Sequence, residues 1–135
     1  MAGKGVPAQG DWTVHHRFLL AAAGIVGALG VAAAASASHA TDSRNMLALA
    51  AICLSHGPAL LALGLAGHSK ALRYAGSVLA IGTLLFAADL VARERLGQGL
   101  FPAAAPIGGA AMILAWVGIA VAGLAGAKTN KFKKD

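Results

Sequence analysis

The chain is poor in charge, in cysteine and in aromatic residues. Only 12% of its 135 residues are charged and 5% are aromatic, whereas 58% are hydrophobic and the mean hydropathy is +0.71. The single cysteine, Cys53, excludes an internal disulfide framework and any Cys-x-x-Cys metal or redox pair. The apolar residues are mainly Ala, Leu and Gly, a composition that favours membrane helices packed through small side chains over a large soluble core.

Eleven basic residues against five acidic ones give a net charge of +6, a balance that can indicate a nucleic-acid partner. The basic residues stand at the ends of apolar runs, however, where membrane topology explains them better. We therefore predict no nucleic-acid partner. Membrane lipids and other integral membrane subunits are the expected partners.

Four apolar runs are near 20 residues long, enough to cross a hydrocarbon core of roughly 30 Å at about 1.5 Å per residue. They cover residues 18–38, 46–66, 71–92 and 105–126. Their short connections predict antiparallel neighbours. The predicted fold is an all-α, integral membrane four-helix bundle over residues 18–126, between an N-terminal segment 1–17 and a basic tail 127–135.

Lys and Arg are distributed unequally between the two ends of these runs. If both termini share one side of the membrane, eight of the basic residues lie on that side and three on the other. The positive-inside rule then predicts that both termini are cytoplasmic. Residues 32–40, AAAASASHA, also resemble a signal-peptidase site. The run before them is longer than a signal core of about 7–15 residues, and three more spans follow, so we predict an uncleaved first span.

Small residues recur at four-residue spacing in the first and fourth runs. Gly24 and Ala28 form such a pair in the first run, and Gly123 and Ala127 form one in the fourth. Small residues at this spacing let helix backbones approach closely in lipid. The pattern predicts a tight bundle but does not specify a dimer.

His56, Thr83 and Trp116 lie near the bilayer midplane, roughly 15–18 Å from a span end at about 1.5 Å per residue. Trp116 is too deep for the interfacial aromatic belt, so its indole N–H needs a partner. A neutral His56 that bonds a neighbouring helix is the favoured interpretation, and a proton or ligand site is the alternative. Gly57 and Pro58 follow His56 and predict a kink in the second helix.

Asp89 and Arg93 lie near the external end of the third run, four residues apart in the favourable order for an ion pair. With His39 they form a predicted external polar group that anchors the following loop. His39, Asp42 and Asp89 have no spacing diagnostic of a metal site, and we predict neither a metal nor a cofactor.

The third connection, extended to residues 97–109, has the sequence GQGLFPAAAPIGG. Pro102 and Pro106 exclude a regular helix across all of it, and Gly108 and Gly109 permit close backbone approach. We predict that Pro106, Gly108 and Gly109 form a rigid cap for the fourth helix, with Pro106 in its first turn. A surface for docking a partner is the second interpretation.

Several motifs occur together in one order: SHGPALL at 55–61, GTLLFAADL at 82–90 and FPAAAPIGGAAMILAW at 101–116. In this combination the chain resembles the domain-of-unknown-function 423 family of small four-span membrane proteins, relatives of eukaryotic transmembrane protein 256. The resemblance covers about residues 18–126 and matches His39 and His56 to two family histidines. FAADL departs from the Gly-Ser-Leu-Tyr pattern of many members, so no hydroxyl or aromatic role is carried over there. The family implies a four-span fold and no established enzymatic activity, and the loop length resembles bacterial members.

The sequence therefore predicts a multi-pass protein of the bacterial inner (plasma) membrane that is not an enzyme. An accessory or structural subunit of a larger complex, for example a respiratory or other energy-transducing assembly, is the favoured function. A small transporter, channel or ligand-binding bundle centred on His56 is the alternative. Catalysis ranks lowest, because the adjacent side chains of Ser55 and His56 are expected to point about 100° apart on a helix.

Overall fold

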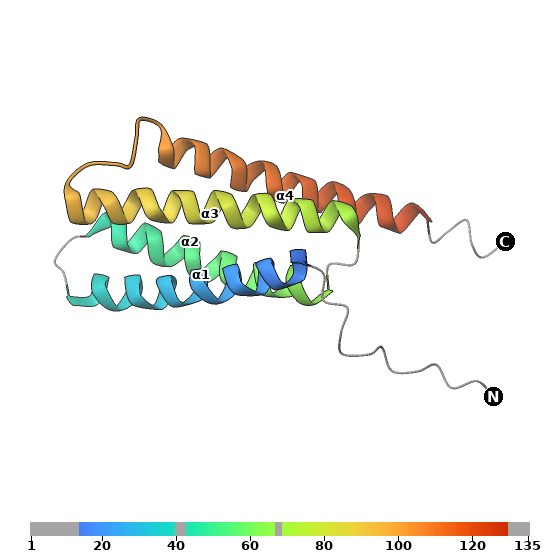
Figure 1. Cartoon of the computed structure of the whole chain (residues 1–135), viewed down its shortest axis with the longest axis horizontal. Coiled ribbons are helices and arrows are strands. Elements are labelled where there is room, and N and C mark those ends of the chain that lie inside the picture. The colour runs from blue at the N-terminus through green and yellow to red at the C-terminus, as the bar shows by residue number, and fades with distance from the viewer. Residues whose placement is uncertain (1–13, 40–42, 67–68, 130–135) are drawn as a thin grey trace.

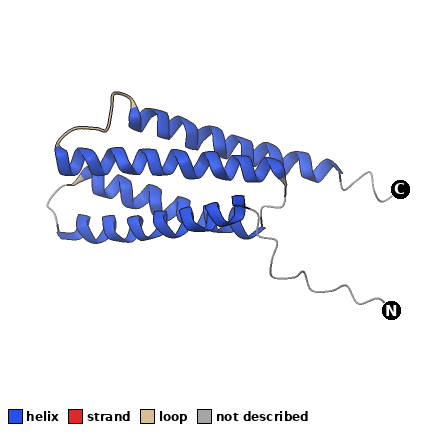
Figure 2. Cartoon of the chain, in the orientation of Figure 1, coloured by secondary structure: helices blue, strands red, loops and turns tan. Residues whose placement is uncertain are grey.

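The computed structural model describes residues 14–39, 43–66 and 69–129, and every regular element in these ranges is an α-helix. The helices are α1 (Val14–His39), α2 (Arg44–Ala66), α3 (Lys70–Leu96) and α4 (Ala104–Thr129), as Figures 1 and 2 show. Each helix encloses one of the four apolar runs. The prediction of an all-α, four-helix chain is confirmed. Most of segment 1–17 and of tail 127–135 lies outside the described residues.

All four helices are long and apolar enough to cross a membrane. Their outward surfaces carry large apolar side chains, such as Ile25 on α1, Ile81 on α3 and Leu124 on α4, which are 54%, 59% and 72% exposed. A surface of this kind suits contact with lipid, in which every backbone polar group must be satisfied within the helices. These features identify a multi-pass membrane protein.

The helices do not form a symmetric square. Helices α1, α2 and α3 contact one another, whereas α4 packs along α3, on the side away from α1 (Figure 1). The buried core lies mainly between the first three helices and includes Leu19, Val26, Cys53, Leu60 and Leu79. Over the described residues, α3 is the most buried of the four helices and α4 the least.

Glycine allows the backbones of α3 and α4 to touch. A Cβ atom added to Gly108 would lie 2.8 Å from both the carbonyl oxygen of Gly82 and the backbone nitrogen of Phe86. A Cβ atom added to Gly82 would lie 2.9 Å from the carbonyl oxygen of Gly108. The absence of both side chains therefore sets the separation of these helices, as expected where dispersion contacts drive association in lipid.

Candidate functional site

A hydrogen bond joins His56 and Trp116, two residues of the predicted midplane group. The indole Nε1–H of Trp116 on α4 donates to Nε2 of His56 on α2 across 3.2 Å, and the rings meet edge to face with centroids 6.0 Å apart. His56 is buried, whereas 44% of Trp116 is exposed. Because an indole nitrogen only donates, Nε2 of His56 must be the unprotonated nitrogen.

The second ring nitrogen of His56 completes this assignment. Nδ1 carries the proton and donates to the carbonyl oxygen of Ile52, 2.8 Å away, with the hydroxyl oxygen of Ser55 at 3.0 Å. The hydroxyl of Ser55 donates to the same carbonyl at 2.9 Å. The hydrogen-bond network thus assigns a neutral imidazole with both nitrogens engaged.

The contact between Ser55 and His56 differs from the sequence-based expectation that the two side chains point apart. They meet because both turn back toward the carbonyl of Ile52 one helical turn earlier. The contact does not make Ser55 a nucleophile, however. The nitrogen facing it already carries the proton, so it is not placed to act as a general base.

The hydrogen bond between His56 and Trp116 spans two helices that otherwise stay apart. Within the described residues, α2 and α4 have no close backbone contact, because α3 packs against both. The bond between these two side chains therefore connects α4 to α2 across a gap that their backbones do not close.

Thr83 is fully buried but belongs to a separate contact. Its hydroxyl donates to the carbonyl oxygen of Leu79, 2.7 Å away on the same helix. This is the usual way in which a hydroxyl is satisfied inside a helix when no neighbour offers a partner. The predicted cluster of three residues is thus a bonded pair, His56 and Trp116, together with a self-satisfied threonine.

Helix α2 continues through Pro58, which lies on its exposed side. Gly57 is buried against α1, where an added Cβ would lie 3.3 Å from the Cα and N atoms of Gly27. The Gly57–Pro58 step therefore combines a close helix contact with a proline that lacks a backbone donor. The kink expected at this step stays a prediction.

Asp89 is the second buried polar centre, and its two carboxylate oxygens hold three segments together. Oδ2 accepts a hydrogen bond from Nε of Arg93 at 2.7 Å, in the predicted ion pair. Oδ1 accepts the backbone N–H of Leu100 at 2.8 Å, and the backbone N–H of Ala105 also interacts favourably with the carboxylate. Gly99 passes so close that an added Cβ would fall 2.6 Å from Oδ1.

These bonds make Asp89 a cap for the start of α4. Ala103, the residue before this helix, has a positive φ of 71° and no side-chain acceptor. The first N–H groups of a helix need acceptors, and an anion is favourable at this end of the helix dipole. Asp89 on α3 supplies the acceptor that the local sequence lacks.

Pro106, Gly108 and Gly109, the residues of the predicted cap, all lie inside α4. The helix begins at Ala104, which shortens the connection to residues 97–103. Pro106 stands in the first turn, where its missing N–H is tolerated. Gly108 packs against α3, whereas an added Cβ on Gly109 would meet nothing within 4 Å.

His39 is exposed at the end of α1, and no hydrogen bond connects it to Asp89 or Arg93 in the described structure.

Sequence reasoning missed a different contact at this end of the bundle. Glu94 on α3 accepts hydrogen bonds from the hydroxyl of Ser43 at 2.7 Å and from the amide of Asn45 at 3.2 Å. Ser43 at the start of α2 fits a helix-capping pattern, but nothing local to it points to a glutamate 51 residues away.

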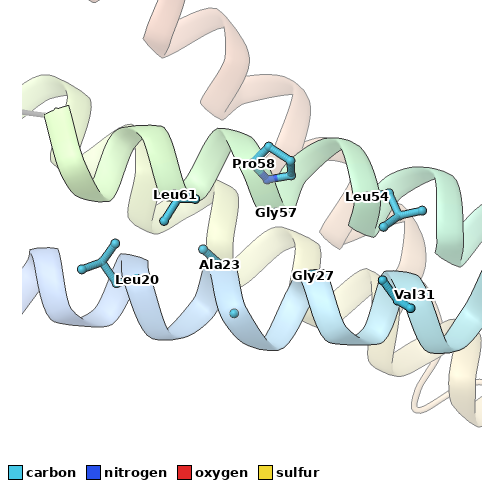
Figure 3. A pocket seen from close by; sticks show the side chains of 9 residues that line it. Leu20, Ala23, Gly27, Val31, Leu54, Gly57, Pro58 and Leu61 are labelled. Carbon is cyan, nitrogen blue, oxygen red and sulfur yellow. The ribbon is translucent and has the colours of Figure 1, made fainter.

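An open apolar groove of about 450 Å³ runs between α1 and α2 (Figure 3). Leu20 and Leu61 line one end, and Val31 and Leu54 line the other. Glycines and Pro58 line the middle, where the absence of large side chains creates the space. The groove and the two polar centres are features of the described chain that a function can use.

Among residues 14–39, 43–66 and 69–129, no three His, Cys, Asp or Glu side chains lie close enough together to hold a metal ion. Cys53 is a buried cysteine with a free thiol.

Residues 26–109 match the family described as protein of unknown function (DUF423). Comparison with curated proteins and with solved structures gives no significant match. The family match runs from the middle of α1 into α4 and includes both histidines of the resemblance, the Asp89–Arg93 pair and the Gly82–Gly108 contact. It confirms the resemblance noted in the sequence, and the chain belongs to the DUF423 family of proteins of unknown function.

Proposed function

We propose that this protein is a non-enzymatic integral membrane protein that serves as a structural or accessory subunit of a larger assembly in the bacterial inner membrane. One observation carries the proposal: the buried polar groups are all satisfied within the chain, and two of them, His56 and Asp89, connect one segment of the bundle to another. His56, Thr83 and Asp89 all form hydrogen bonds within the chain. In the described part of the chain, no buried side-chain nitrogen or oxygen lacks a partner.

The state of His56 supports this role over transport. Because Nε2 accepts the bond from Trp116 and Nδ1 donates to Ile52, a second proton on the ring would displace the indole N–H. A residue that carries protons or ligands needs a nitrogen that it can offer without disturbing the fold. In His56 both nitrogens are already engaged: Nδ1 bonds the carbonyl of Ile52 within α2, and Nε2 connects α2 with α4.

The outer face of α4 is the surface that we assign to the partner subunit. Among the described helices, α4 has close backbone contacts with α3 alone, and it presents Ile113, Val117 and Val121, which are 67%, 55% and 59% exposed. Two anchors fix its position, one at Asp89 and one at Trp116. A helix held rigidly at its start and its middle, with its outer face free, suits packing against helices of another chain.

Site-directed photocrosslinking in native membranes tests the proposal. A photoreactive amino acid at Val117 on α4 is compared with the same substitution at Ile25 on α1, which is 54% exposed. We expect a discrete protein adduct from position 117 and a larger complex on native gels after mild detergent extraction. A chain that migrates as a free monomer and gives no protein adduct from position 117 would refute the subunit role.

The proposed orientation has both termini in the cytoplasm, on the basis of the eight basic residues assigned to that side. A C-terminal fusion to green fluorescent protein is expected to fluoresce, and a fusion to alkaline phosphatase is expected to be inactive. The opposite pair of results would reverse the orientation while leaving the fold unchanged.

A further inference from the structure

We propose that the groove between α1 and α2 binds one acyl chain of an anionic phospholipid, whose phosphate is held by Arg17. This inference concerns a binding site and does not depend on the subunit role. It rests on the shape and lining of the groove, on its length, and on the charge at one of its ends.

The lining of the groove suits a hydrocarbon chain. All the residues that line it are apolar, and its floor is formed where α1 and α2 come close at Gly27 and Gly57. A volume of about 450 Å³ has room for roughly 15 methylene groups, if each takes about the 30 Å³ of a water molecule. A neighbouring helix, about 10 Å across, is too wide to enter a groove between two such close backbones.

The length of the groove matches one leaflet. Along α1 it extends from Leu20 to Val31, eleven residues apart, which corresponds to about 16 Å at 1.5 Å per residue. Half of a hydrocarbon core of roughly 30 Å is about 15 Å. An acyl chain that enters at the Leu20 end would therefore reach the Val31 end near the middle of the bilayer.

Arg17 stands where the headgroup of that lipid would lie. Residues 17, 20, 24, 27 and 31 follow at alternating spacings of three and four, which places Arg17 on the groove face of α1. It is one turn beyond Leu20, about 4.5 Å nearer the membrane surface. Arg17 is exposed, and no carboxylate of the described residues forms an ion pair with it.

The guanidinium group of Arg17 matches phosphate in charge and geometry, because its planar donors can bond two phosphate oxygens together. A basic residue at the end of a groove lined by apolar residues favours a phospholipid over a free phosphate ion, which would make no contact with the groove. It also favours a phospholipid over an uncharged hydrocarbon, which would form no ion pair with Arg17.

Native mass spectrometry of the full chain tests this proposal. The purified protein is mixed with equal amounts of phosphatidylglycerol and phosphatidylcholine, and the lipid retained on the protein is measured. Gly24→Leu fills the groove at a position where an added Cβ meets nothing within 4 Å. Gly123→Leu is the matched control, since Gly123 is an exposed helical glycine on α4 with the same open space.

We expect the wild type and Gly123→Leu to retain one phosphatidylglycerol, and Gly24→Leu to lose it. Arg17→Gln should lower the preference for phosphatidylglycerol over phosphatidylcholine about fivefold, the effect of one basic residue near a membrane surface. Arg73→Gln on α3, near the same membrane surface, should leave the preference unchanged. Equal retention by the two leucine variants, or an unchanged preference in Arg17→Gln, would overturn the proposal.

A second measurement on the wild-type protein does not depend on any variant folding. Photoactivatable phosphatidylglycerol with the reactive group on its acyl chain should label peptides that contain residues 20–31 and 54–61. Equal labelling of α4 would show only general contact with lipid and would refute a specific site. Protection of the groove by another polypeptide in native membranes would likewise refute it.

Discussion

The contact between α3 and α4 yields a prediction that separates two adjacent glycines. Gly108 and Gly109 are neighbours in one turn of α4. By helix propensity alone, replacing either glycine by alanine should stabilise the helix by about 0.5–1 kcal/mol. Their surroundings differ. A Cβ on Gly108 would lie 2.8 Å from two backbone atoms of α3, whereas a Cβ on Gly109 would meet nothing within 4 Å.

The size of the clash sets the expected magnitude. Ordinary contacts begin at 3.4 Å, so Gly108→Ala requires α3 and α4 to move apart by about 0.6 Å. The obstructing atoms belong to the backbone of Gly82 and Phe86, which has no rotamer with which to give way. Overpacking of this kind costs about 1–3 kcal/mol. The helix-propensity gain offsets part of this cost, and we expect a net destabilisation of about 1–2 kcal/mol for Gly108→Ala.

The assay is reversible unfolding in mixed micelles with increasing sodium dodecyl sulfate, monitored by circular dichroism. Gly109→Ala should unfold at a higher detergent fraction than the wild type, and Gly108→Ala at a lower one. The two variants should differ by about 1.5–3 kcal/mol in the free energy of unfolding. Equal stability of the two variants, or a stabilising effect of Gly108→Ala, would refute the conclusion that these glycines set the helix separation.

Three further predictions concern the polar centres and the end of α3. Trp116→Phe keeps the ring but leaves Nε2 of His56 without its donor, and should lower the free energy of unfolding in the same assay by about 1 kcal/mol; an unchanged value would mean that the bond contributes nothing. Asp89→Asn should accelerate amide hydrogen exchange at Leu100 while leaving the middle of α4 unaffected, because an amide replaces one of two carboxylate acceptors; unchanged exchange at Leu100 would contradict the capping role. Gly97→Ala should destabilise the protein by about 1 kcal/mol in the detergent assay, because φ at this position is +73°, where a side chain is unfavourable. A stabilising effect of Gly97→Ala, like the one expected for Gly109→Ala, would contradict this reasoning.

The four helices and the Asp89–Arg93 pair could be predicted because each depends on local information. Hydropathy over about 20 residues marks a membrane span, whatever the neighbouring helices do. An acid four residues before a base meets it on one face of the same helix, and the observed N–O distance of 2.7 Å follows from that spacing. Trp116 could also be expected to need a partner, since an indole N–H in lipid has no water to bond.

The small-residue pattern shows where local information ends. Gly24 and Gly123 belong to the pairs that the spacing marks for close packing, yet an added Cβ at either residue would meet nothing within 4 Å. Close backbone contacts instead join Gly82 to Gly108 and Gly27 to Gly57, and the sequence alone paired neither couple. The two kinds of glycine look alike in sequence, because a lipid-facing glycine and an interhelical glycine are each surrounded by apolar residues.

Composition and hydropathy alone thus established an all-helical chain with four potential membrane spans. Tertiary structure alone decided that His56 accepts from Trp116, that Asp89 caps α4, and that α1 and α2 leave a groove between them. The reason is that lipid removes the usual contrast between an apolar inside and a polar outside. Without that contrast, the pattern of side chains does not fix the rotation of each helix, and only the packed arrangement shows which faces meet.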